Sequence, residues 1–104
     1  MKVIRDCFGR SVRLTDERTT HILQHPEMVG MEAEIVQALR SPLEVRISRS
    51  DKTVQLFYEY YAYTRVGGKW LCVVVKYRSD DDGFVITAYL TDRLKEGETI
   101  WPTK

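Results

Sequence analysis

The sequence lacks the features typical of secreted, membrane-spanning or disulfide-rich proteins. It contains only two cysteines, Cys7 and Cys72, which are far apart and lack CxxC spacing. Because the opening residues MKVIRDCFG contain no secretory signal, we expect both thiols to be reduced. No stretch approaches the roughly 20 apolar residues that a membrane helix requires. These absences predict a cytoplasmic protein without membrane contact.

The chain also lacks the common cofactor motifs and a strong charge of either sign. Its 16 Lys and Arg residues nearly balance 15 Asp and Glu residues, so any nucleic-acid site must be a local cluster of cations. There is no GxGxxG or Walker pattern for a nucleotide. His21 and His25 are four residues apart, but no further metal ligand follows at a recognisable spacing. We therefore predict neither a metal nor a cofactor.

What is present is a single domain of 104 residues with a clear order of elements. Thr15 is a candidate N-cap for a first helix that ends near His25, before Pro26. A second helix is expected from about residue 28 to 40, and the segments KVIRD and SVRL near the start are extended. Four strands joined by short turns follow, at residues 43–48, 53–63, 69–78 and 83–93. The predicted fold class is α+β and RNase-like, with two N-terminal helices packed on one face of a four-stranded antiparallel meander.

Alternation along the predicted strands assigns side chains to the two faces of this sheet. In the last strand the apolar set should face the helices, together with the odd-numbered residues of the strand before it. The second strand is ambiguous, and if its even-numbered residues face the core then Glu59 and Tyr61 join the open face. The inward-facing residues expected from the other three strands are Leu43, Val45, Ile47, Leu71, Val73, Val75, Tyr77, Phe84, Ile86, Ala88 and Leu90.

The opposite, open face then collects Arg46, Lys76, Thr87 and Tyr89. Two cations, a hydroxyl and a phenol are groups that hold a phosphate and stabilise charge developing on it. The alternative is an ordinary polar face turned to water, as antiparallel sheets commonly have. His21 also has two interpretations: it is either a hydrogen-bonded structural residue or a general acid or base.

Several short motifs occur in the order of a known family. These motifs are LTDERTTHILQHPEM, SPLEVRISRSD, GGKWLCVVVKY, GFVITAYLTDR and a final ETIW. Together they resemble the phage-type branch of the barnase–EndoU–colicin–RelE-like nuclease superfamily, a group of small RNases, from about residue 13 to 101. The net charge of +1 is low for a toxin RNase of this kind.

The resemblance implies a nuclease site on the sheet face away from the helices, in a toxin-like or phage-associated setting. His21 matches the family's helix histidine, Lys76 its strand lysine, and Thr87 and Tyr89 its final-strand pair. Either Arg46 or Arg49 matches the strand arginine. The implied partners are RNA and a protein inhibitor or antitoxin; the oligomeric state stays open.

The function expected from these residues is metal-independent endoribonuclease activity. The ribose 2′-hydroxyl would attack the neighbouring phosphate and leave a 2′,3′-cyclic phosphate. His21, or Tyr89 in its place, would move protons, while Arg46 and Lys76 stabilise the phosphorane and Thr87 positions an oxygen. Tyr61 and Trp70 would stack an unpaired base. The alternative is a non-catalytic module that keeps the fold and binds RNA, a phosphate ligand or a protein.

Overall fold

The computed structural model describes residues 1–102, which form a seven-stranded sheet, two α-helices and a 3-10 turn. No helix among these residues is long and apolar enough to cross a membrane. The elements are β1 (Lys2–Arg5), β2 (Ser11–Leu14), α1 (Asp16–Leu23), η1 (Pro26–Met28), α2 (Glu32–Arg40), β3 (Glu44–Ser48), β4 (Val54–Tyr61), β5 (Lys69–Ser79), β6 (Asp82–Thr91) and β7 (Gly97–Trp101).

The sheet corrects the predicted fold. Its strand order is β1-β2-β6-β5-β4-β3-β7, and β2 pairs parallel to β6, so the sheet is mixed. The prediction of a four-stranded antiparallel meander with two helices is therefore wrong. Strands β3 to β6 do follow one another as antiparallel neighbours, but the β1–β2 hairpin extends the sheet beyond β6 and β7 extends it beyond β3. The physical reason is that both meander edges present backbone groups that another strand can pair.

The strand β7 carries little of the alternation by which a strand is predicted. Its residues GETIW are half-buried or exposed, and its pairing with β3 contains a register shift between Val45 and Arg46. The backbones approach closely at Gly97, where an added Cβ would lie 2.2 Å from the Ile47 carbonyl oxygen. Glycine at this position allows β7 to pair with β3.

The first helix begins as predicted and the second does not. Thr15 caps α1, because its side chain accepts a hydrogen bond from the Arg18 amide at 3.1 Å. The second helix was expected to begin near residue 28, but α2 begins at Glu32. Gly30, with φ of 79°, separates it from the 3-10 turn η1. A residue in the left-handed backbone conformation cannot continue a right-handed helix. Glycine adopts this conformation without strain because it has no Cβ.

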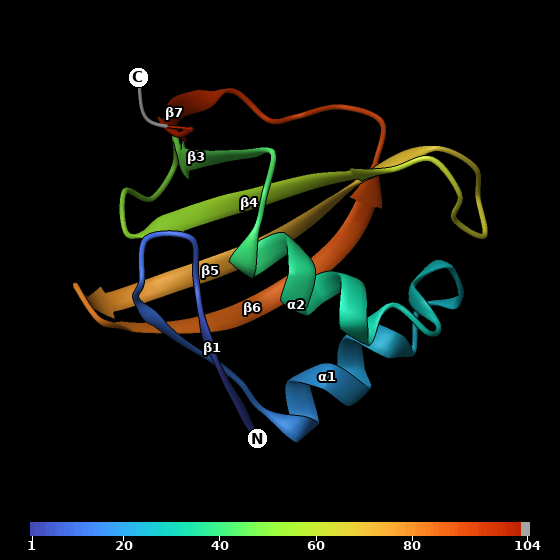
Figure 1. Cartoon of the computed structure of the whole chain (residues 1–104), viewed down its shortest axis with the longest axis horizontal. Coiled ribbons are helices and arrows are strands. Elements are labelled where there is room, and N and C mark those ends of the chain that lie inside the picture. Colours follow the sequence, from blue (N-terminus) through green and yellow to red (C-terminus); the bar gives the residue numbers. More distant parts are fainter. Residues whose placement is uncertain (103–104) are drawn as a thin grey trace.

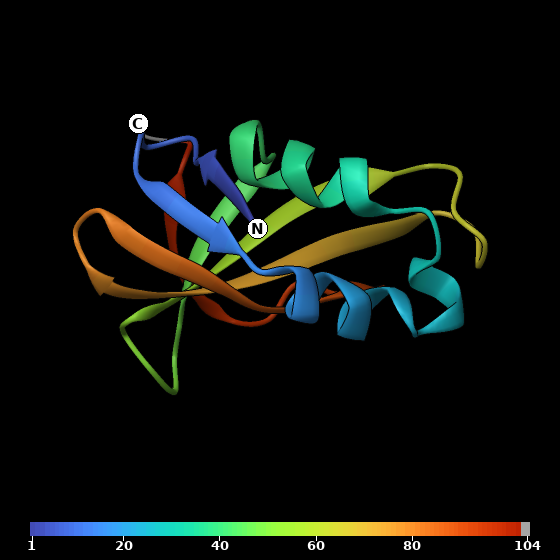
Figure 2. The same cartoon turned by 90° about the horizontal axis from the view of Figure 1, so that it is seen from below.

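The helices and the sheet enclose one main core. Figure 1 shows α2 in front of β4 and β5, and α1 beyond β6 at the margin of the sheet. The turned view in Figure 2 places α2 over one face and the β6–β7 connection on the opposite face. We call these the helix face and the far face. The main core on the helix face includes Ile22, Met28, Ile35 and Leu39 from the helical segments and Val45, Phe57, Leu71, Val73, Val75 and Ala88 from the strands.

The side-chain alternation is resolved in β4 and interrupted in β6. Phe57 is fully buried in the main core, so the odd-numbered residues of β4 face the helices. In β6 the register shifts: Val74 pairs with Thr87, whereas Val75 pairs with Val85. This bulge reverses the alternation, so Val85 is buried on the helix face and Phe84 is not, contrary to the prediction for Phe84.

Candidate functional site

The strand register places four of the predicted site residues on the far face. Arg46 pairs with Leu56, Leu56 with Val74 and Val74 with Thr87, which forms one row across β3, β4, β5 and β6. Directly paired residues share a face of the sheet. Lys76 and Tyr89 belong to the same face, because in β5 and β6 they alternate with Val75 and Ala88 of the main core.

A groove of about 340 Å³ opens on this far face. It lies between the β3–β4 turn and the β6–β7 connection. Its floor is apolar and its rim is polar and charged, a combination typical of sites for small ligands, which have volumes of roughly 300–1,000 Å³. The floor consists of Val54, Leu56 and Val74, and the rim of Ser48, Arg49, Ser50, Asp51, Lys95 and Glu96. We call it the far-face groove.

Four of the predicted site residues, Arg46, Arg49, Lys76 and Thr87, lie at or next to this groove rather than meeting at one point. Arg49 lines it directly. The other three are each paired with a residue of its floor: Arg46 with Leu56, Lys76 with Val54, and Thr87 with Val74.

Each of these cations is already held by a carboxylate. The Arg46 guanidinium pairs with Glu44 and donates to the Lys95 carbonyl at 2.9 Å, and Arg49 pairs with Glu96. Lys76 Nζ lies 3.4 Å from Asp51 Oδ2. A bound phosphate would therefore compete with side-chain carboxylates.

Of these carboxylates, Asp51 accepts the most hydrogen bonds from residues 1–102. Its Oδ1 accepts hydrogen bonds from the Thr53 amide at 2.9 Å and the Thr53 hydroxyl at 2.6 Å. These bonds, followed by the contact with Lys76, hold the pKa of the Asp51 carboxyl below its usual value. Asp51 is consequently an anion at neutral pH, which makes it a counter-charge for Lys76 and a weak base.

Tyr89 does not reach the groove, because the part of the far face around it is covered. Leu94, from the β6–β7 connection, packs against a second apolar cluster with Tyr58, Cys72 and Tyr89. The connection is tied down by a hydrogen bond from the Lys95 amide to the Tyr58 hydroxyl at 3.0 Å. The expectation of an open face is therefore wrong at this position.

Burial also changes the chemistry of the Tyr89 hydroxyl. This oxygen is buried and has no hydrogen-bond partner among residues 1–102. Burial, and then the neighbouring Cys72, raise the pKa of Tyr89 above its usual value. The phenol stays protonated at any physiological pH, and RNA in the groove would not contact it.

His21 lies on the margin of the sheet rather than on its far face. Its side chain is exposed on α1, edge-on to His25 with 6.2 Å between ring centroids. The pairing of β6 with β2 covers only two residue pairs, and α1 packs against β6 beyond it. His21 thus belongs to α1, the helix that packs against β6, and β6 contains Thr87.

The two predicted base-stacking residues are separated from the groove. Tyr61 lies on the helix face, where its hydroxyl donates to Gln37 Oε1 at 2.6 Å. Trp70 is on the far face, but it packs edge-on against Tyr58 and Tyr60, with ring centroids 6.4 and 5.4 Å away.

No family model, curated protein or solved structure matches this chain. Among residues 1–102 there is also no group of three or more His, Cys, Asp or Glu residues that could hold a metal ion. Sequence reasoning missed Asp51, Lys95 and Glu96, all of which lie in connections. The turn-forming Asp51 carried the only usable signal, since strand periodicity says nothing about which loops meet.

Proposed function

We propose that this chain is an endoribonuclease that binds single-stranded RNA in the far-face groove. One observation carries the proposal: Arg49 lines a single groove with an apolar floor, and Arg46, Lys76 and Thr87 are strand-paired with residues of that floor. An unpaired base fits an apolar floor, and cations at the rim attract the phosphates beside it. The resemblance of the sequence motifs to small RNases supports the same substrate. With RNA as the substrate, we propose that the protein acts in the cytoplasm.

The row of paired residues suggests a path for the RNA. It runs from Arg46 over Leu56 and Val74 to Thr87, and α1 with His21 lies beyond that end. A strand bound along this path has cations at its first phosphates. Its scissile phosphate would then lie near Thr87, and to act on it the exposed imidazole of His21 would have to reach over the sheet margin from the neighbouring helix α1.

In this reaction the 2′-hydroxyl oxygen attacks phosphorus while the bond from phosphorus to the 5′ oxygen breaks. The proton of the 2′-hydroxyl passes to a base, and the departing 5′ oxygen takes up a proton. The products are a 2′,3′-cyclic phosphate and a 5′-hydroxyl. We assign proton transfer to His21, orientation of a phosphate oxygen to Thr87, and stabilisation of negative charge to Lys76. Tyr89 takes no part, because its hydroxyl is buried.

The test is incubation of purified protein with a mixed-sequence, single-stranded RNA, with and without EDTA, followed by analysis of the new ends. The proposal requires 2′,3′-cyclic phosphate ends in both conditions. His21→Ala should lower cleavage at least 100-fold, because general acid–base groups contribute about 10²–10⁴-fold. The double variant Lys76→Ala, Thr87→Val should lower it about 10²–10³-fold, as expected for loss of groups that stabilise the developing charge. Arg40→Ala is the matched control, since Arg40 is exposed on α2. Full activity in the double variant would contradict the assignment.

A second candidate function is RNA binding without cleavage. The observation that favours it is that Arg46, Arg49 and Lys76 are all paired with carboxylates, an arrangement that moderates affinity for phosphate. Binding of RNA without the appearance of new RNA ends would support this second function over cleavage. Each cation that contacts a phosphate should then lower the slope of log affinity against log salt concentration by about 1 when replaced by alanine.

A further inference from the structure

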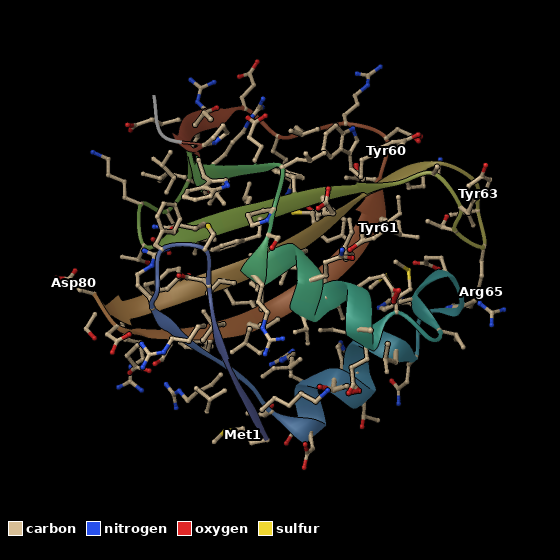
Figure 3. The ribbon with its side chains drawn as sticks, in the orientation of Figure 1. Met1, Tyr60, Tyr61, Tyr63, Arg65 and Asp80 are labelled. Atoms are coloured by element: carbon tan, nitrogen blue, oxygen red, sulfur yellow. The ribbon has the colours of Figure 1, made fainter. Side chains whose placement is uncertain are left out.

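A second pocket, of about 240 Å³, lies at the opposite end of β4 from the far-face groove. It is formed where the turn before α2 faces the β4–β5 loop. In Figure 3 Tyr61 lies between β4 and α2, whereas Tyr63 and Arg65 lie on the loop at the end of the molecule. The residues that line the pocket are Val29, Gly30, Met31, Glu34, Tyr61, Tyr63, Thr64 and Arg65. We call it the end pocket.

One carboxylate oxygen in the end pocket is buried without a partner. Glu34 Oε1 is inaccessible to solvent and accepts no hydrogen bond from residues 1–102. Glu34 also takes part in no ion pair within that range. A buried carboxylate oxygen without a donor is unfavourable, and such groups in folded proteins commonly have a partner. The position calls for a positively charged donor.

The aromatic residues around Glu34 suit the same kind of ligand. Tyr61 and Tyr63 both line the end pocket, and the faces of their rings attract cations. Burial, followed by the nearby carboxylates of Glu59 and Glu34, raises the pKa of Tyr61 above its usual value. No lysine or arginine among residues 1–102 lies over either ring.

The surroundings of the end pocket resemble a surface that contacts protein. Tyr63 is 96% exposed, and Val29 and Val66 are 45% and 51% exposed. Exposed apolar and aromatic side chains grouped beside a polar anchor are typical of interfaces between proteins. The β4–β5 loop, which presents Tyr63 and Val66, has hydrogen bonds of its own, from the Val66 amide to Thr64 Oγ1 at 3.2 Å and from the Gly67 amide to the Thr64 carbonyl at 3.1 Å.

We propose that the end pocket receives a lysine or arginine side chain of a partner polypeptide. The ammonium or guanidinium group lies against the rings of Tyr61 and Tyr63 and donates to the Glu34 carboxylate, which turns its buried Oε1 toward the pocket. The apolar part of the same side chain packs on Val29 and Met31. A volume of 240 Å³ accommodates one long side chain but is below the usual size of drug-like ligand sites. This site does not depend on the proposed RNA cleavage.

The test is an NMR titration of the ¹⁵N-labelled chain with four probes. Two are the capped tripeptides Gly-Lys-Gly and Gly-Arg-Gly, the third is the neutral isostere Gly-norleucine-Gly, and the fourth is free butylammonium. The lysine or arginine peptide should shift the amides of residues 29–34 and 61–65 in a saturable way, and the norleucine peptide should not. Absence of saturable shifts with both cationic peptides would overturn the proposal. Binding of butylammonium alone would overturn the assignment to a polypeptide.

Variants separate this site from general attraction of cations. Glu34→Gln should weaken peptide binding about tenfold, as expected for loss of a hydrogen bond between charged groups. Glu32→Gln is the matched control, because Glu32 lies on the same helix but pairs with Lys2 at 2.9 Å. Tyr63→Ala, at an exposed position, should weaken binding about threefold. Arg65→Ala should strengthen it, because Arg65 repels a cation at the rim. Equal affinities in the Glu34 and Glu32 variants would contradict the proposal.

Discussion

Arg46 and Thr87 lie in the same row across the sheet, with Leu56 and Val74 between them. They are separated by three strand spacings, about 14 Å between backbones. The Arg46 guanidinium is held by Glu44 and by the Lys95 carbonyl on its own side of the groove. One phosphate therefore cannot contact both residues. Under the proposed function the two residues would contact different groups of an extended RNA strand.

Removal of the carboxylate beside Lys76 should strengthen RNA binding. We expect Asp51→Asn to tighten binding about two- to fivefold at low salt, because it frees Lys76 while the amide oxygen still accepts from Thr53. The gain should shrink as salt rises, since these groups are partly exposed. Fluorescence anisotropy with a labelled single-stranded RNA measures it. Asp80→Asn, in the exposed β5–β6 turn, is the control, and an equal gain there would indicate only a change of net charge.

The buried carboxylate of Asp6 should be important for stability. It accepts hydrogen bonds from the Phe8 and Arg10 amides, from Arg10 Nε at 2.9 Å and from the Tyr77 hydroxyl at 2.5 Å. Asp6→Asn leaves Arg10 without its counter-charge and should lower the free energy of unfolding by about 3–5 kcal/mol. Urea denaturation measures this loss.

The matched control for Asp6 is Asp82→Asn, which breaks the ion pair of a half-exposed carboxylate with Arg13. That variant should cost about 1 kcal/mol or less. A similar loss in both variants would contradict a special role for the buried carboxylate.

Stability should decline as the pH rises above about 9. Burial raises the pKa of the Cys7 thiol from 9.0 to about 12, and burial raises the pKa of Tyr58 from 10.0 to about 12. The unfolded chain therefore loses these protons at a lower pH than the folded chain. The stability that these groups contribute is fully present below their unfolded pKa values and is lost as the pH rises to their folded pKa values. Tyr58 alone should contribute about 1.4 kcal/mol per pH unit between 10 and 12.

Urea denaturation at a series of alkaline pH values measures this decline. Tyr58→Phe removes the ionisable group and should lower the slope of the profile between pH 10 and 12 by about 1.4 kcal/mol per pH unit, because Cys7, Tyr61 and Tyr89 still contribute. Tyr63→Phe is the control, because the Tyr63 side chain is 96% exposed. A profile as steep in Tyr58→Phe as in the parent protein would refute the linkage to Tyr58.

The β6–β7 connection should protect the thiol of Cys72. Leu94 covers the cluster in which Cys72 is fully buried, so Leu94→Ala should cost about 1–3 kcal/mol and expose the thiol to disulfide reagents. The rate of labelling by Ellman's reagent, in a Cys7→Ser background, measures the opening. Leu43→Ala, at a 54% exposed position, should leave this rate unchanged. If Leu94→Ala also left it unchanged, another segment would have to cover Cys72.

Local patterns predicted the interior of most elements but not the extent of the sheet. The Thr15 cap and the alternation of β5 depend on neighbours in the chain, and the structure contains both. The β6 bulge escaped prediction because one extra residue reverses alternation without a change in composition. The strand β7 was not predicted because pairing with β3 defines it, whereas its own sequence has little alternation of apolar and polar residues.

The sequence by itself determined that Arg46, Lys76, Thr87 and Tyr89 share one face, because side chains alternate along a regular strand and the β6 bulge lies before Thr87. Only the tertiary structure decided what that face contains. Lys95 and Glu96 reach the groove from a connection more than 40 residues after Arg49, and Leu94 covers the neighbourhood of Tyr89. The meeting of distant loops depends on which strands pair and where the chain crosses the sheet. Those contacts are non-local, and no short segment encodes them.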